Sequence, residues 1–383
     1  MKSSWEKIKM RKIADLNPYK ITKEFRFETI EYLDISSVGS GYITKPKIMK
    51  LSEAPSRAKR LVNDGNIILS TVRPNRRSFY FFKHAKDNLV VSTGFAVLQA
   101  KKKVIPKFLY YLINDYKFTG YLTKSAKGSA YPAVDEEIIN NAILSIPKEL
   151  KEQRKITSIL SAYDELIENN NRRIGILEEM AETIYKEWFV HFRYPGHEKD
   201  KMIDSELGKI PEGWEVKFKD YVDFLEGPGL RRRQYREKGI PFLNIRTLNN
   251  NEIDFTKVNF IDEKEVSEHY NHFLLLENDH VVSSSGTIGR VVTIRENHLP
   301  LLLNTSIIRM RPKNSRVVGK WFLKHFLKSM YFQGQIRAYA IGSAQINYGP
   351  SHLKRMWLIL PTENISKLYE DIVTPLEEQI KNN

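Results

Sequence analysis

Short turns rich in arginine, asparagine and serine are where side chains of this sequence could recognise another molecule. Residues 71–77 form one such turn after the apolar run Ile67-Ile68-Leu69. Its candidate side chains are Arg73, Asn75, Arg76 and Arg77. Arginine and asparagine can make paired hydrogen bonds to guanine and adenine edges, so these residue types suit the reading of DNA. A solvated hairpin turn is the alternative interpretation.

A second turn, residues 124–131, comes shortly before the last apolar run of the same half of the chain. Gly128 would let the backbone approach a phosphate closely, because glycine carries no side chain. Phosphate contacts give affinity, whereas contacts to base edges give sequence choice. The candidate residues in this turn are Lys124, Lys127, Ser129 and Tyr131.

The later half of the chain has turns in the corresponding places, at residues 283–290 and 339–348. Their candidate residues are Ser285, Thr287, Arg290, Ser343, Gln345, Asn347 and Tyr348. This more neutral set is what we expect if the two halves read different base sequences. The run Arg231-Arg232-Arg233 is the densest positive cluster, and we favour it as a DNA contact over a plain surface turn.

The overall charge agrees with a polyanionic partner. The 383 residues include 61 Lys and Arg against 46 Asp and Glu, a net charge of +15, which favours nucleic acid. The basic residues form short clusters and not one amphipathic helix, which argues against a membrane surface. No apolar run approaches the ~20 residues of a transmembrane helix. Cysteine is absent, which excludes disulfides and thiolate metal sites, and we expect a cytoplasmic protein.

No group of residues predicts a catalytic or metal site. Asn17-Pro18-Tyr19 is similar to the Asn-Pro-Pro-Tyr element of amino-methyltransferases, but one Pro is missing and no glycine-rich cofactor loop supports it. There is no Gly-x-x-x-x-Gly-Lys-Ser/Thr loop for ATP phosphates. His269 and His272 lack a third metal ligand nearby. We therefore expect no enzyme activity and no bound cofactor or metal in this chain.

The chain repeats itself with an offset of about 210 residues, the signature of an internal duplication. Five matched pairs keep their order and spacing: Trp5-Glu6 with Trp214-Glu215, Ile67-Ile68 with Val281-Val282, Thr93-Gly94-Phe95 with Thr305-Ser306-Ile307, Gly128-Ser129-Ala130 with Gly342-Ser343-Ala344, and Ile146-Pro147 with Leu360-Pro361. One match would be noise, but five in register predict two copies of one domain.

Each copy contains short β-branched and aromatic runs separated by turn residues. We expect one helix per copy, over about residues 106–118 and 318–332. The predicted fold class is α/β (α+β), with two similar mixed domains separated by a long coiled-coil-type helix. The predicted organisation is a first domain (1–147), a central helix (148–194), a linker (195–210), a second domain (211–361) and the start of a distal helical region (362–383).

The long helix is predicted by a heptad seam, which keeps one stripe facing a partner helix. Its positions alternate in steps of four and three: Ile156, Leu160, Tyr163, Ile167, Asn170, Ile174, Leu177, Ala181, Ile184 and Trp188. Some 40 residues at 1.5 Å rise give a length of roughly 60 Å, enough to separate two domains. Asn170 in the seam would specify register, or else mark a break together with the poor helix former Gly175.

These features resemble the specificity subunit of type I restriction–modification enzymes, over nearly the whole chain. The matching residues are Glu152-Gln153-Arg154-Lys155-Ile156, Ile159-Leu160, Asp164, Ile167-Glu168-Asn169-Asn170, Leu177-Glu178, Trp188-Phe189-Val190, and Ser-Glu-Leu-Gly-Lys-Ile-Pro-Glu-Gly-Trp at residues 205–214. The resemblance implies a non-catalytic reader of double-stranded DNA. Each domain would read one half of a bipartite target, and the helices would set the gap between the halves.

The resemblance also implies partners for the helical region. Two modification subunits would dock there and carry the S-adenosylmethionine chemistry, and a restriction subunit that uses ATP and Mg²⁺ can join them. Such subunits have a second long helix packed on the first, of which residues 374–381 resemble only the start. We therefore expect an exposed seam that another chain covers: a second copy, a separately encoded half-subunit or a modification subunit. A non-functional truncation is the alternative. The predicted interface residues are Ile156, Leu160, Tyr163, Ile167, Asn170, Ile174, Leu177, Ile184 and Trp188.

Two functions of other classes stay open at this point. One is a coiled-coil scaffold whose basic domains bind nucleic acid without sequence choice. The other is a stand-alone DNA methyltransferase or nuclease with an unrecognised site.

Overall fold

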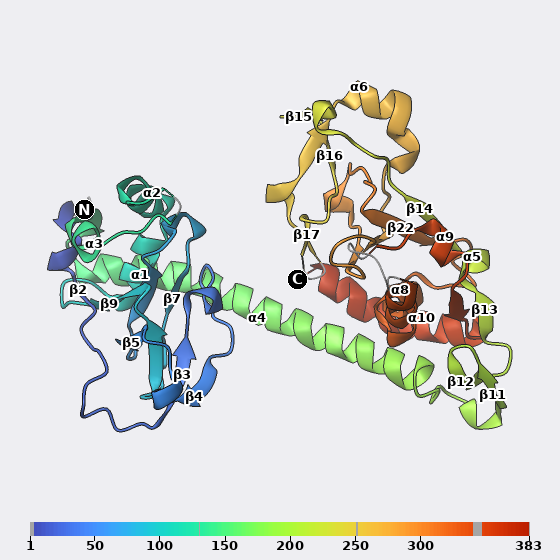
Figure 1. Cartoon of the computed structure of the whole chain (residues 1–383), viewed down its shortest axis with the longest axis horizontal. Helices are drawn as coiled ribbons and strands as arrows, with labels where there is room; N and C mark the ends of the chain where they lie inside the picture. The colour runs from blue at the N-terminus through green and yellow to red at the C-terminus, as the bar shows by residue number, and fades with distance from the viewer. Residues whose placement is uncertain (1–3, 130, 250–251, 340–346, 383) are drawn as a thin grey trace. The chain divides into compact units, whose positions relative to one another are not determined.

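The computed structural model describes residues 4–129, 131–249, 252–339 and 347–382. The chain divides into two compact units, Met1–Ile167 and Glu168–Asn383. Both units combine strands and helices, and the boundary falls inside one long helix, α4 (Leu150–Phe189) (Figure 1). Within the described residues, no helix is long and apolar enough to cross a membrane.

The first unit contains two four-stranded sheets. One has the order β2-β9-β6-β7, with every neighbouring pair antiparallel. Its strands are β2 (Ala14–Leu16), β9 (Phe95–Ala100), β6 (Ile67–Ser70) and β7 (Phe79–Phe81). The central strand β6 is buried throughout, which explains why its sequence is a continuous apolar run and does not alternate. The second sheet consists of β4 (Lys47–Lys50), β3 (Thr29–Leu33), β8 (Leu89–Ser92) and β5 (Ala58–Leu61), in that order.

The helix expected over residues 106–118 is two helices in the structure, α1 (Pro106–Asn114) and α2 (Tyr116–Ser125). Asp115 between them has an extended backbone, and its carboxylate accepts a hydrogen bond from the Lys117 amide at 2.8 Å, which caps α2. The second unit has the same break at Ser329, between α7 (Lys320–Lys328) and α8 (Met330–Tyr339). The prediction of one continuous helix per copy is therefore wrong.

The second unit repeats the first sheet with the order β14-β22-β20-β21 and the same antiparallel pairing. Its strands are β14 (Val222–Glu226), β22 (Ile307–Pro312), β20 (His280–Ser283) and β21 (Val291–Thr293). The strands β1 (Trp5–Lys9) and β10 (Ile143–Pro147) pair in the first unit, as β13 (Glu215–Lys217) and β23 (Trp357–Ile359) do in the second. The predicted duplication is confirmed.

The copies differ outside this shared sheet. Where the first unit has the sheet β4-β3-β8-β5, the second has a three-stranded sheet and a helical stretch over residues 263–273. The small sheet consists of β15 (Tyr235–Arg236), β19 (Asn259–Ile261) and β16 (Ile240–Phe242). Part of the predicted linker is also folded, because β11 (Met202–Ser205) and β12 (Gly208–Pro211) form a hairpin.

Helix α4 is unbroken from Leu150 to Phe189. It continues through Asn170 and Gly175, so the alternative of a break there is wrong. Beyond it the chain turns at Phe192, whose φ is 55°, before Pro195-Gly196. The final helix α10 (Glu363–Asn382) lies along the second half of α4, as the red and green helices of Figure 1 show. The Tyr369 ring is 5.9 Å from Trp188, and the Arg173 guanidinium donates to Gln379 at 2.9 Å.

Candidate nucleic-acid interface

In the first unit the two candidate turns meet. Val72 forms a β-bridge with Ala133, and the Arg73 amide donates to the Pro132 carbonyl at 2.7 Å. The Val134 amide donates to the Thr71 carbonyl at 2.8 Å. Residues more than fifty positions apart therefore form one surface at the end of β6, as joint recognition by the two turns requires.

The side chains on this surface are cationic and aromatic. The Arg73 guanidinium lies 5.0 Å from the centre of the Tyr131 ring, a cation–π contact that orients it. Arg73 has a left-handed backbone with φ of 48°, which is unusual for a residue with a side chain. Asn75 and Arg76 are exposed. These side chains offer the donors that guanine and adenine edges accept.

Arg77 is used within the protein, which differs from its predicted place among the DNA contacts. Its guanidinium donates to the Asn114 carbonyl at 2.7 Å and to the Asn114 side chain at 2.6 Å. It also lies 3.9 Å from the centre of the Tyr116 ring. These contacts hold the turn against the junction of α1 and α2, and they leave Arg77 fewer donors for a ligand.

The remaining first-unit candidates differ in setting, because Lys124 lies in the last turn of α2, whereas Lys127 and Ser129 follow that helix. Lys124 and Ser129 are exposed. The Lys127 ammonium is 3.2 Å from the Asp135 carboxylate, and both side chains stay largely exposed, so this ion pair is weak and easily exchanged for a phosphate. Gly128 has φ of 94°, and a Cβ there would lie 3.1 Å from the Tyr131 carbonyl, so the turn needs glycine.

The second unit builds the same junction with the same backbone bonds. The Ser284 amide donates to the Ser306 carbonyl at 2.9 Å, and the Thr71 amide of the first unit donates to the Gly94 carbonyl at the same distance. The Tyr348 amide donates to the Ser284 carbonyl at 3.0 Å, just as the Val134 amide donates to the Thr71 carbonyl. Ser285 bridges Asn347 where Val72 bridges Ala133. Both copies therefore share a junction of two turns at the end of one strand, β6 in the first unit and β20 in the second.

The second-unit side chains at this junction differ from prediction in detail. Ser285 is half-buried, Thr287 and Asn347 are exposed, and Tyr348 is only 3 % exposed. Arg290 donates to the Leu248 carbonyl at 2.7 Å, so part of its guanidinium is occupied within the protein. Ser343 and Gln345 lie outside the described residues. The backbone frame of the two junctions is shared, whereas their side-chain chemistry is not.

Arg231, Arg232 and Arg233 are exposed on the segment before β15. Gln234 holds this segment, because its side chain accepts from the Arg231 amide at 2.8 Å and donates to the Tyr270 hydroxyl at 3.1 Å. The three guanidinium groups are therefore presented from a tethered turn, which lowers the entropy lost when they bind an anion.

A cavity of about 300 Å³ lies at the second-unit junction. Its walls are mostly hydroxyl, amide and backbone groups: Glu226, Ser284, Ser285, Thr305, Ser306, Asn347, Tyr348 and Gly349. Glu226 ends β14, and the next residue, Gly227, packs on Asn304 so closely that a Cβ would lie 2.3 Å from the Asn304 nitrogen. Sequence reasoning missed Glu226, since one carboxylate at a strand end forms no pattern. The Gly227-Pro228-Gly229 sequence beside it was the available signal.

Each unit is anchored on its long helix by a carboxylate at the corresponding position. Asp164 is the fifteenth residue of α4, and Glu377 is the fifteenth of α10. Asp164 accepts from the Tyr111 hydroxyl at 2.6 Å and pairs with Lys107 at 3.1 Å. Glu377 pairs with Lys324 and with His325, whose Nε2 is 3.1 Å away. Both partners of each carboxylate come from the helix that follows the sheet, α1 or α7.

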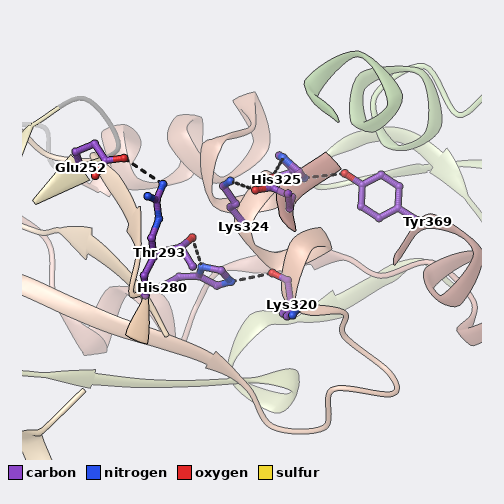
Figure 2. Close-up of polar contacts among 9 residues, drawn as sticks. Glu252, His280, Thr293, Lys320, Lys324, His325 and Tyr369 are labelled. Carbon is purple, nitrogen blue, oxygen red and sulfur yellow. Dashed lines mark hydrogen bonds and ion pairs between the residues drawn. The ribbon is translucent and has the colours of Figure 1, made fainter. Parts of the chain in front are cut away.

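The Glu377 anchor belongs to a buried polar cluster (Figure 2). The Tyr369 hydroxyl is 2.7 Å from His325 Nδ1, so a neutral His325 can accept a hydrogen bond from Tyr369, while its Nε2 lies 3.1 Å from the Glu377 carboxylate. Burial acts to raise the pKa of Glu377, but His325 and Lys324 outweigh it and hold this pKa at about 2. Close by, His280 contacts the Thr293 hydroxyl at 3.0 Å and the Lys320 carbonyl at 2.8 Å, and burial lowers its pKa to about 4.

The predicted interface stripe of α4 is only partly exposed. Leu160, Tyr163 and Ile167 are 37, 63 and 59 % exposed. Ile156 packs on the core of the first unit. The rest of the stripe is covered within the second unit: Leu177 is 7 % exposed, Ile184 and Trp188 pack on its core, and Ile174 is half-buried. The expectation that this second half lies open is wrong, because α10 and α7 of the same chain cover it.

No group of three or more His, Asp or Glu side chains in the described part of the chain is placed to hold a metal ion. The candidate surfaces described above instead present separate hydrogen-bond donors and acceptors. These suit recognition of an extended polar ligand.

Comparison with known proteins agrees with these features. The family model described as "Type I restriction modification DNA specificity domain" matches residues 2–179 and 211–383. A type I restriction enzyme specificity subunit of Methanocaldococcus jannaschii, MjaIX, is 26 % identical over 360 residues, which cover 92 % of this chain and 78 % of that protein. A second from the same organism, MjaVIII, is 27 % identical over 293 residues, 74 % of this chain and 66 % of that protein.

A solved structure shows the same fold. The crystal structure of the type I restriction–modification S subunit from M. genitalium has a TM-score of 0.59 at 16 % identity, and the match covers 100 % of this chain and 91 % of that one. With both copies of the domain matched, the chain belongs to the type I restriction–modification DNA specificity family.

Proposed function

We propose that this chain is the sequence-reading subunit of a type I restriction–modification complex, and that each unit reads one half of a bipartite DNA target. The observation that supports this most is the repeated junction. Thr71 and Ser284 make the same backbone bonds, yet the side chains around them differ. A common frame with different polar side chains is what one fold needs to read two different base sequences.

The chemistry of the complex is proposed to lie on other subunits. S-adenosylmethionine would be bound by two modification subunits, and ATP with Mg²⁺ by a restriction subunit where one is present. This chain would bind neither. Its contribution to the reaction would be to bring the modification subunits to the target base.

The exposed part of the α4 stripe supports a partner-binding role. Ile167 is the eighteenth residue of α4 and is 59 % exposed. Ile380 is the eighteenth residue of α10 and is 5 % exposed. The apolar face that is covered in the second unit is therefore open in the first. We propose that a helix of another chain covers Leu160, Tyr163 and Ile167, because clustered apolar side chains on one helix face favour such packing.

Methylome sequencing tests the DNA-reading function. Cells that contain this gene with its modification subunits should show methylation at a split motif, with two defined halves and a fixed gap. Deletion of this gene alone should abolish it. Methylation that persists without the gene, or that follows an undivided motif, would refute the proposal.

Light scattering tests the proposed helix partner. The double variant Leu160→Glu and Ile167→Glu should keep its fold and lose binding to a second copy or to the modification subunits. Unchanged association in the variant, or a wild-type chain that neither self-associates nor binds modification subunits, would argue against this use of the stripe.

A further inference from the structure

The two junctions differ in the charged side chains that surround them. In the first unit Arg73 and Arg76 supply cationic donors beside Tyr131. In the second unit the residue that corresponds to Arg73 is Gly286, and the cavity at the junction has in its wall the Glu226 carboxylate from the end of β14. Arg290, the cation of this turn, has one guanidinium nitrogen bonded to Leu248. The first junction is therefore rich in donors, whereas the second offers an anionic acceptor.

Among the described residues, Glu226 has no partner that explains its place in the protein. Its carboxylate makes no hydrogen bond or ion pair within the described ranges 4–129, 131–249, 252–339 and 347–382. Glu226 is half-buried, and this burial raises the pKa of its carboxyl above the ordinary value. A partly dehydrated acceptor gains more from a donor than a fully hydrated one does.

Tyr348 gives a second, independent sign of a missing ligand. It is 3 % exposed and lines the same cavity, and its hydroxyl has no hydrogen-bond partner in the part of the chain that the structure describes. The hydroxyl is close enough to Glu226 for that carboxylate to contribute to raising the pKa of the phenol, after the larger effect of burial. A buried hydroxyl without a partner costs free energy that a bound ligand can recover.

The chemistry of the cavity selects the ligand. A phosphate is disfavoured beside a carboxylate, because like charges repel. An ionised carboxylate only accepts hydrogen bonds. In the major groove, cytosine presents an amino group and no acceptor on the same base. Adenine presents an acceptor beside its amino group.

We propose, on the basis of the proposed function, that this cavity receives the exocyclic amino group of a cytosine in the second half of the target. Glu226 would accept the hydrogen bond from that amino group. The second unit would thus read one C·G pair through an acidic side chain. The first unit would read its half through Arg73, Asn75 and Arg76.

The test is the methylated motif of the complex that contains Glu226→Gln. Glutamine keeps the shape but adds donors, so it accepts other bases. Discrimination should fall by roughly 5- to 150-fold at one C·G position of the second half, with every other position unchanged. The matched control is Glu237→Gln, an exposed glutamate of the same unit outside the cavity, which should keep the wild-type motif.

Three results would overturn the inference: an unchanged motif with Glu226→Gln, relaxation at an A·T pair, or relaxation in the first half. If Glu226→Gln does not assemble, Glu226→Asp shortens the reach by one methylene and should weaken choice at the same C·G pair only. Unaltered choice with Asp would also overturn it. A wild-type methylome without a split motif would instead refute the proposed function, so the two failures are distinguishable.

Discussion

The anchors of the two units place the same chemical group in two different environments. Asp164 remains 46 % exposed beside Tyr111 and Lys107. Glu377 is 3 % exposed between Lys324 and His325. The difference arises because the second half of α4 and α10 pack together around Glu377, whereas the corresponding face near Asp164 is open. One duplicated contact has therefore become a buried ionic cluster in one copy and a surface contact in the other.

The largest expected effect tests this difference directly. Glu377→Ala leaves the Lys324 ammonium buried without its partner, and removal of one member of a buried pair costs about 3–5 kcal/mol. Asp164→Ala should cost about 1 kcal/mol or less, since exposed pairs contribute little. Urea unfolding of the two variants and the wild type measures both values. Equal losses would show that burial of Glu377 does not matter in solution.

A matched apolar pair sharpens the comparison. Ile380→Ala removes buried methylenes from the α10 face and should lower the free energy of unfolding by about 2–4 kcal/mol. Ile167→Ala changes an exposed side chain at the corresponding position and should stay within about 0.5 kcal/mol in the isolated chain. Thermal unfolding measures both variants. If Ile167→Ala also lowers the free energy of unfolding strongly, that residue is already covered in the isolated chain.

The reading turns extend the comparison from stability to recognition. Asn75→Ala should reduce base discrimination by about 1–3 kcal/mol in one half of the target only. Asn347→Ala in the second unit serves as the matched variant and should affect the other half. Competition binding with duplexes that change one half at a time reports the result. Equal weakening of both halves by either variant would contradict separate reading.

The last comparison concerns the pH dependence of stability and distinguishes α10 from α4. Burial raises the pKa of Glu370 to about 7, although its carboxylate accepts from the Phe322 amide at 2.7 Å. The folded state therefore binds more protons than the unfolded state between about pH 4.5 and 7, and this group's contribution to stability falls as pH rises through that range. Below it, Glu377 acts in the opposite direction, because its pKa of about 2 means that stability is lost as pH falls.

Glu370→Gln should flatten the pH dependence of unfolding between about pH 4.5 and 7 by up to about 3 kcal/mol, because the pKa rises from 4.5 to about 7 and each pKa unit corresponds to about 1.4 kcal/mol. The corresponding residue of α4 is Thr157, which cannot titrate, so the first unit provides an internal control. An identical pH slope in wild type and Glu370→Gln would show that Glu370 is not buried in solution.

The sequence by itself determined the duplication, the long helix and the turns at the ends of the strands. These are local or periodic properties: a heptad seam predicts α4 from side-chain spacing, and matched motifs reveal two copies without any knowledge of how they pack. The break at Asp115 was missed, since capping competes with helix propensity over only one or two residues.

Only the tertiary structure decided which polar residues remain available. Arg77 and Asn75 lie in the same turn, yet Arg77 is bound to Asn114 whereas Asn75 is exposed. Ile167 and Ile380 have the same side chain, but the first is 59 % exposed and the second only 5 %. Burial and pairing depend on residues that lie far apart in the sequence, 37 positions for Arg77 and Asn114, and spacing along the chain contains no information about those contacts.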